Sequence, residues 1–173
     1  MPDKPKVSII TPSFNQARFL EQTMRSVLEQ DYPNIEYIVI DGGSSDGSLE
    51  IIQKYADRLA YWQSQKDKGQ TDAINQGFAR ATGEILAWLN SDDILYPGAV
   101  SAAVRQLQYH PEVGMVYGDC HWINAEGKVI GNFPAAQTNL KKLRRGYVHI
   151  PQQTSFFRTE LWRKVGPLDD SFY

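Results

Sequence analysis

The sequence predicts an α/β fold in which helices flank a mostly parallel central sheet. Short apolar runs alternate with amphipathic stretches between residues 7 and 117, which is the pattern of repeated β-α-β units. The 173 residues, 42% of them hydrophobic, are enough for one domain with a substantial core. Beyond residue 118 the pattern changes, and a turn at 125–127 predicts a small antiparallel hairpin in the second half of the chain.

The apolar runs define the expected strands. The run at 36–40 is β-branched and apolar, as expected for a strand buried on both faces. The first strand is expected to end at Pro12, because proline lacks the N–H that a ladder uses. The expected strands of the first half are 7–11, 36–40, 61–64, 84–89 and 113–117.

Helices are expected between these strands. Leu20, Met24 and Val27 have the spacing of one helical face, and Asn15 is expected to cap that helix. The expected helices are 17–29, 48–55, 70–79 and 98–109. Later in the chain we expect a basic, partly helical segment at 138–146, a strand at 154–157 and a last helix at 160–165.

Composition excludes several classes of protein. A net charge of −2 and a pI of about 5.9 argue against a nucleic-acid binder with a basic surface. The single cysteine allows no internal disulfide and fits a reducing compartment. No apolar run approaches the about 20 residues of a transmembrane helix, and the N-terminus lacks a signal-peptide pattern. We therefore expect a cytoplasmic protein without a transmembrane segment, with contact at the inner face of the membrane left open.

Polar residues gather where the predicted strands end, which is the edge of a parallel sheet where ligands bind. Asp41 closes an apolar run and could accept from a base N–H or a ribose hydroxyl; alternatively it caps the loop that follows. The glycines of that loop are spaced wrongly for a dinucleotide-binding fingerprint, and the chain has no P-loop motif. This spacing disfavours a dehydrogenase and a P-loop enzyme.

The adjacent acids Asp92 and Asp93 give a sharper signal. Two neighbouring carboxylates after a buried strand repel each other unless a cation lies beside them. Such hard oxygen ligands suit Mg²⁺ or Mn²⁺, which commonly bind a substrate diphosphate together with one or two protein carboxylates. The alternative is that Asp93 only caps the following turn.

The loop at 67–72 leads into a predicted helix and leaves two interpretations open. Lys68 could meet a phosphate or a base and Asp72 could pair with a cation, or both could be solvated. Asn75 and Gly77 are expected to serve helix packing. The three histidines do not have the spacing of a zinc site, and no Ser/His/Asp arrangement supports nucleophilic hydrolysis.

Taken together, ordered sequence blocks resemble one known family. They lie at 7–15, 37–48, 68–77, 83–93, 116–119 and 149–158, and so cover nearly the whole chain. The chain resembles the nucleotide-sugar-dependent glycosyltransferases of family 2, which have the Rossmann-like GT-A fold. The resemblance implies a hexosyl transferase in cell-surface polysaccharide or glycan synthesis. It would move a sugar from a nucleoside-diphosphate sugar, with UDP favoured, to an acceptor hydroxyl with inversion.

The resemblance also implies which residues bind the donor: Thr11, Pro12, Asn15, Asp41, Lys68, Asp72 and Asp92. Among these, Thr11, Pro12 and Asn15 would border the nucleotide. Asp41 would contact the base or ribose, and Lys68 and Asp72 would lie beside the base or diphosphate. Asp92 and Asp93 would hold Mn²⁺ or Mg²⁺, with Asp93 the better candidate for the metal. Asn90 stands where the family commonly has the first acid of Asp-x-Asp, so metal binding would rely more on the diphosphate.

A second departure concerns the end of the chain. The family places a catalytic carboxylate well beyond a Gly-Pro-Leu-Asp segment, which here stands at 166–169 and is followed by four residues. We expect the base beyond Tyr173, and Asp169 and Asp170 to form a turn. In that interpretation 1–173 is one GT-A domain, with a nucleotide-sugar-binding half at 1–118 and the start of an acceptor half at 119–173. This chain alone would bind donor and hydrolyse it slowly but transfer little sugar.

The acceptor side is defined less well by the sequence. A saccharide or lipid-linked acceptor is expected; Trp122, Tyr147, His149 and the amides at 152–153 could line its site, although Trp122 and Tyr147 could equally belong to the core. The basic run at 141–145 could be a solvated helix or could approach an anionic lipid-linked acceptor or a membrane.

Two rival functions stay open. A non-catalytic nucleotide-sugar-binding module would fit the missing base. A nucleotidyltransferase would share the sheet and the metal, but it would need a glycine-rich, arginine-containing loop after the first strand, which 11–15 does not provide.

Overall fold

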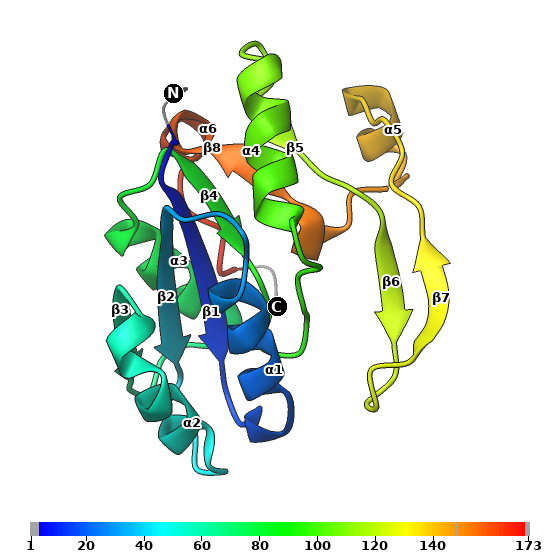
Figure 1. Cartoon of the computed structure of the whole chain (residues 1–173). Coiled ribbons are helices and arrows are strands. Elements are labelled where there is room, and N and C mark those ends of the chain that lie inside the picture. The colour runs from blue at the N-terminus through cyan, green and yellow to red at the C-terminus, as the bar shows by residue number, and fades with distance from the viewer. Residues whose placement is uncertain (1–3, 148, 172–173) are drawn as a thin grey trace.

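A computed structural model describes residues 4–147 and 149–171 and shows a six-stranded sheet with the order β3-β2-β1-β4-β8-β5 (Figure 1). Its first four members in this order are parallel, whereas β8 runs antiparallel between β4 and β5. The strands are β1 (Val7–Ser13), β2 (Ile35–Asp41), β3 (Tyr61–Ser64), β4 (Ile85–Trp88), β5 (Met115–Val116) and β8 (Phe156–Arg158). The predicted fold class is confirmed.

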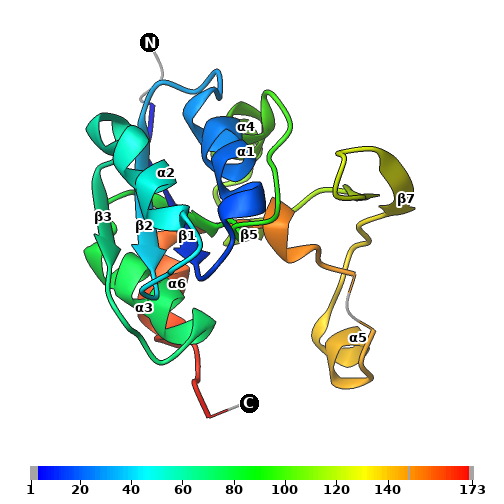
Figure 2. The same ribbon diagram turned by 90° about the horizontal axis from the view of Figure 1, so that it is seen from below.

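Helices cover both faces of the sheet (Figure 2). They are α1 (Ala17–Leu28), α2 (Ser48–Lys54), α3 (Gln70–Arg80), α4 (Ala99–Tyr109) and α6 (Thr159–Val165), with 3₁₀ turns η1 (Ala56–Arg58) and η2 (Gln152–Thr154). Helices α1, α2 and α4 pack with Val7 and Ile9 in one apolar layer. Helices α3 and α6 pack with Ile10 in the other. Because neighbouring residues of β1 enter opposite layers, this strand is buried at every position.

The second half of the chain carries two elements outside the six-stranded sheet and its covering helices (Figures 1 and 2). Strands β6 (Cys120–Ile123) and β7 (Val129–Phe133) form the predicted antiparallel hairpin. Helix α5 (Leu140–Arg144) follows and has no buried residue. Among the residues described, none of the helices is both long and apolar enough to cross a membrane.

The predicted end of the first strand at Pro12 is wrong. Strand β1 continues to Ser13, and Pro12 lies opposite Ile40 of β2. Ser13 accepts a backbone hydrogen bond on the β2 side, while Ile10 accepts one on the β4 side. Pro12 is two residues after Ile10, so its backbone faces the same side, toward β4. The pairing of β1 with β4 ends at Trp88, opposite Ile10. The missing N–H of Pro12 would therefore point where the sheet has no hydrogen-bond acceptor to pair with.

The predicted helix cap at Asn15 is also wrong. The cap position of α1 is Gln16, which makes no side-chain capping bond. The first amides of the helix are instead satisfied from another loop: Gln16 N–H donates to Ser48 Oγ and Ala17 N–H to Asp46 Oδ2, 2.9 Å away. Asn15 adopts φ = 53° and accepts from the N–H of Ser45. The loop before α1 and the loop before α2 are therefore joined by hydrogen bonds in both directions.

Gly77 brings α3 close to β1, as its place in the sequence predicts. A Cβ at this position would lie 2.4 Å from Cγ2 of buried Ile10. We expect Gly77→Ala to lower the free energy of unfolding by about 1–3 kcal/mol through overpacking. Denaturant titration, with Ala79→Ser at an exposed position of the same helix as a control, measures this. An unchanged midpoint for Gly77→Ala would show that α3 shifts freely on the sheet.

Glu36 links neighbouring segments at the edge of the sheet where the parallel strands begin. It accepts from Ser8 Oγ and from both N–H and Oγ1 of Thr82. Burial acts to raise the pKa of Glu36, but these hydrogen bonds outweigh it and hold the pKa below its ordinary value. The carboxylate therefore stabilises the fold above its unfolded pKa, and this stabilisation is lost as the pH falls through the folded pKa.

We accordingly expect Glu36→Gln to destabilise the chain by about 1 kcal/mol at neutral pH. The difference from the parent chain should narrow below about pH 4, where the unfolded carboxyl is protonated. Thermal unfolding across this pH range tests the expectation. Glu84→Gln, at an exposed position, is the control. A destabilisation independent of pH would mean that packing rather than charge is responsible.

Candidate functional site

A polar cavity of about 760 Å³ opens at the carboxyl ends of the parallel strands. Its walls come from the loops after β1, β2, β3 and β4 and from the start of α3, which is where an open parallel sheet binds ligands. The lining residues are Pro12, Ser13, Phe14, Gln16, Gly42, Gly43, Lys66, Asp67, Gly69, Gln70, Ala73, Asn90, Ser91 and Asp92. Of the residues expected to bind the donor, Pro12 and Asp92 lie on this wall.

Asp41 lies directly beneath the wall and is fully buried. Its Oδ2 accepts from the N–H groups of Gly43 and Ser44 and from Ser64 Oγ, at 3.1, 2.9 and 2.7 Å. Its Oδ1 accepts from Ser44 Oγ. This is the loop-capping geometry that the sequence left open as an alternative. Contact between Asp41 and a base or ribose stays a prediction.

Thr11 and Asn15 are likewise held by protein partners. Thr11 is fully buried, and its Oγ1 lies 2.9 Å from the hydroxyl of Tyr37. Asn15 accepts from Ser45 and donates its own N–H to Ser44 Oγ. Both residues therefore shape the loops on either side of the cavity. Whether they border a nucleotide is a prediction that the protein geometry leaves untested.

The loop after β3 lines the cavity with different residues from those that the sequence singled out. Lys66 and Asp67, the two residues immediately before Lys68, lie on the wall. Asp72 accepts from the N–H of Lys68 and from Gln76 Nε2, so it organises this loop and the first turn of α3. Asp67 approaches Gly42 closely: a Cβ on Gly42 would lie 3.0 Å from Oδ2 of Asp67. The pairing of β3 with β2 brings these loops together, and no local signal reveals it.

The acidic pair lies at the exit of β4, and its two members face different surroundings. Asp92 is exposed and lines the polar cavity. Asp93 is half-buried, and its Oδ2 accepts from Asn90 Nδ2 at 3.2 Å. Burial, followed by the charge of Asp92, raises the pKa of Asp93 above its ordinary value. A cation beside the pair would relieve both effects.

Asn90 connects this pair to two other parts of the chain. Its Oδ1 accepts from Gln70 Nε2 at the start of α3, and its Nδ2 also donates to Gln152 Oε1 in η2. Gln152 in turn donates to the carbonyl of Trp88 in β4. This network was missed by sequence reasoning because its members lie as far as 82 positions apart along the chain.

The donor set fits a divalent cation that is completed by a ligand. Among the residues described, no three His, Cys, Asp or Glu side chains lie together as a preformed metal centre. Asp92 and Asp93 nevertheless provide two adjacent carboxylates at the exit of β4, of which Asp92 lines the polar cavity. Neither lies within ion-pair distance of a described Lys, Arg or His. Mg²⁺ commonly uses one or two such carboxylates together with substrate phosphates.

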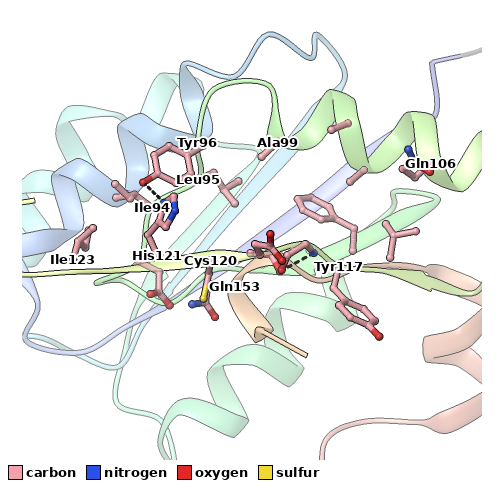
Figure 3. A pocket seen from close by; sticks show the side chains of 18 residues that line it. Ile94, Leu95, Tyr96, Ala99, Gln106, Tyr117, Cys120, His121, Ile123 and Gln153 are labelled. Carbon is pink, nitrogen blue, oxygen red and sulfur yellow. Dashed lines mark hydrogen bonds between the residues drawn. The ribbon is translucent and has the colours of Figure 1, made fainter. Parts of the chain in front are cut away.

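A second cavity of about 350 Å³ has Asp93 among its lining residues. Figure 3 shows the side chains around it. Its wall is largely apolar and comes from α4, the segment before it and the chain between β5 and β6, with Leu95, Ala103 and Phe156 among its lining residues. Tyr96 and His121 meet across it, with the tyrosine hydroxyl 2.9 Å from Nδ1. The acidic pair thus lies between a polar and an apolar cavity.

The aromatic residues suggested for the acceptor side are not in the core. Trp122 and Tyr147 are exposed, with 55% and 60% of their surface accessible. Trp122 and His149 both contact Phe133, with ring centroids 6.3 and 6.0 Å away. Sugar binding by these residues stays a prediction. Asp169 caps a turn by accepting from the N–H of Ser171, as expected.

The family model described as Glycosyl transferase family 2 matches residues 8–166, which includes every loop of the polar cavity. The chain belongs to glycosyl transferase family 2. A relative from Mycobacterium tuberculosis, described as an uncharacterized glycosyltransferase, is 38% identical over 175 residues, covering 99% of this chain and 66% of the relative. A beta-1,3-glucosyltransferase of Campylobacter jejuni, named for GalNAc(5)-diNAcBac-PP-undecaprenol, is 35% identical over 75% of this chain and 42% of its own length.

Two solved structures share the fold. Staphylococcus aureus TarS 1-349 in complex with UDP-GlcNAc superposes with a TM-score of 0.76, at 22% identity, over 92% of this chain and 47% of that one. The mannosyltransferase PcManGT of Pyrobaculum calidifontis, in complex with GDP-Man and Mn²⁺, superposes with a TM-score of 0.73 at 22% identity. The match covers 98% of this chain and 49% of that one. This family 2 chain therefore has the GT-A fold and spans 42–66% of the length of these four proteins.

Asp41 is the residue of this family 2 site whose loss should cost most stability. In Asp41→Asn an amide NH₂ replaces one buried oxygen and faces donors instead of accepting from them. We expect the free energy of unfolding to fall by about 2–3 kcal/mol. Denaturant titration measures this, with Asp57→Asn at an exposed position as control. Equal stability of the two variants would contradict the assigned role of Asp41 in organising the loop.

Proposed function

We propose that the polar cavity binds a nucleoside-diphosphate sugar, with UDP as the favoured nucleotide, and that the protein is an inverting, metal-dependent glycosyltransferase. The observation that carries the proposal is the acidic pair at the exit of β4: Asp92 lines the cavity formed by the family 2 loops, and its neighbour Asp93 lines the adjoining apolar cavity. The family relatives support transfer of a sugar as the reaction. The solved neighbours named with UDP-GlcNAc and GDP-Man support a nucleotide sugar as the donor class.

The wall opposite the acids suits the diphosphate and ribose of such a donor. Gly42 and Gly43 bring backbone to the cavity wall at the end of β2, and Lys66 supplies a cation on the loop after β3. Asp41 holds the glycine turn from below, so that the turn is preorganised. Lys68 and Asp72 remain candidates beside the base or diphosphate, through the loop that they shape.

The reaction that this site would serve is displacement at the anomeric carbon. The acceptor hydroxyl oxygen forms the new bond to that carbon, the bond to the nucleoside diphosphate breaks, and the hydroxyl proton passes to a base. Mn²⁺ or Mg²⁺, held by Asp92 and Asp93, would neutralise charge on the departing diphosphate. Protein groups that are fixed in place before the reaction make such stabilisation effective.

We also propose a role in synthesis of a cell-surface polysaccharide or glycan, at the inner face of the membrane in the cytoplasm. Support comes from a relative whose name includes an undecaprenol-linked saccharide. The acceptor would then be a saccharide or a lipid-linked saccharide. A binding module without turnover is the competing function, since it would use the same cavity.

Nucleotide titration tests the donor site. Calorimetry with UDP, GDP and dTDP, each with and without Mn²⁺, should show binding of UDP that Mn²⁺ strengthens. We expect Asp92→Asn and Asp93→Asn each to weaken it at least about tenfold, since even outer-shell partners of a metal contribute about 10–100-fold. Asp57→Asn, on the remote turn η1, is the matched control.

The outcomes separate the alternatives. Binding of UDP that is indifferent to Mn²⁺ and to both aspartate variants would refute the metal-assisted donor site. If Asp92→Asn alone weakened binding, the exposed carboxylate would be the metal ligand and the preference for Asp93 would be wrong. Tight donor binding without any hydrolysis of the sugar–phosphate bond would favour the binding module.

A further inference from the structure

Helix α5 is unusual because it forms without burying any residue. Its ends are closed by local hydrogen bonds alone. Asn139 Oδ1 accepts from the N–H of Lys142 at the amino end. At the other end Gly146, with φ = 76°, donates to Leu143 and Tyr147 donates to Lys142, which is the Schellman pattern. The chain therefore holds this short helix in shape on the outside of the molecule.

The surface of this helix combines cations with large apolar side chains. We name it the basic patch and define it by Leu140, Lys141, Lys142, Leu143, Arg144, Arg145 and Tyr147. Four of the 18 basic residues of the chain lie in it and none of the 20 acidic ones. Leu140 and Tyr147 expose 63% and 60% of their surface. Within the described residues, no carboxylate lies within ion-pair distance of its four cations.

The arrangement on the helix is amphipathic. Leu140 and Leu143 are three positions apart and share a face, and the four basic positions occupy the remaining circumference. Both Figures 1 and 2 show α5 standing away from the sheet and its covering helices. The patch is therefore accessible to a large flat partner as well as to a small one.

The chemistry of the patch selects among partners. A protein core would bury the leucines but would also remove from water four cations that have no carboxylate partner among the described residues, which is costly. A dissolved polyanion would satisfy the cations but would leave the leucines and the tyrosine in water. A bilayer with anionic lipid headgroups satisfies both sets, because lysine and arginine reach the headgroups while short apolar side chains enter the interface.

We propose that the basic patch docks the protein on a membrane surface rich in anionic phospholipid. Lys141, Lys142, Arg144 and Arg145 contact headgroup phosphates, and Leu140, Leu143 and Tyr147 enter the boundary of the acyl chains. This inference does not depend on the donor cavity, because none of these residues lines it. Its failure would therefore leave the proposed transferase site untouched, and the reverse also holds.

Vesicle sedimentation tests the docking. The 173-residue chain is mixed with vesicles of phosphatidylcholine alone or with about one third phosphatidylglycerol, at low and high salt. We expect binding only to the anionic vesicles and weaker binding at high salt. Lys141→Gln/Lys142→Gln should weaken partitioning by about 25-fold, since each cation contributes about fivefold near an anionic surface. Leu140→Ser/Leu143→Ser should weaken it too, with salt dependence retained.

Two controls make the result decisive. Arg163→Gln/Lys164→Gln removes two exposed cations from α6 and should leave partitioning unchanged. Circular dichroism confirms that each variant is folded. Equal loss in the α6 variant would show that only net charge matters and would overturn the proposal. No binding to anionic vesicles would also overturn it. If the leucine variant bound vesicles as well as the parent chain, and soluble polyphosphate bound the protein equally well, the partner would be a dissolved polyanion instead.

Discussion

The buried carboxylate of Asp41 is the interaction on which the polar cavity depends. It accepts from the glycine-containing loop after β2 and from Ser64 at the end of β3, so that one side chain sets the distance between two loops. A buried charge is tolerated only when its acceptor positions are filled, and here protein donors fill them. The backbone of Gly42 and Gly43 consequently forms a fixed wall instead of a mobile loop.

The acidic pair shows how neighbours in sequence acquire different chemistry. After β4 the chain turns, and Asp92 emerges into the polar cavity while Asp93 turns toward the apolar one. Burial and the charge of Asp92 raise the pKa of Asp93, whereas Asp92 remains exposed to solvent. The two carboxylates are therefore not equivalent. This difference is a reason to compare them one at a time instead of treating them as a single acidic motif.

The regular elements of the first half could be predicted because their causes are local. Apolar runs and helical spacing placed β3 at Tyr61–Ser64 and put α3 within one residue of its observed ends. Pairings between segments far apart in the sequence could not be predicted. Nothing near Phe156 indicates that β8 inserts antiparallel between β4 and β5, or that Gln152 reaches Asn90. The same holds for the site: Asp92 was found from its strand end, whereas Lys66 and Gln70 reach the cavity through tertiary packing.

The long-range contacts that sequence could not show join the two halves of the chain. Gln152 of η2 bonds to Asn90, which also bonds to Asp93 and to Gln70 at the start of α3. Farther along α3, Asn75 donates to and accepts from the backbone of Leu168. The segments after residue 150 are therefore attached to the helix and the acidic pair that border the polar cavity. A ligand that moved Asn90 would have to change the hydrogen bonds of η2 as well, so the second half of the chain would respond to occupancy of that cavity.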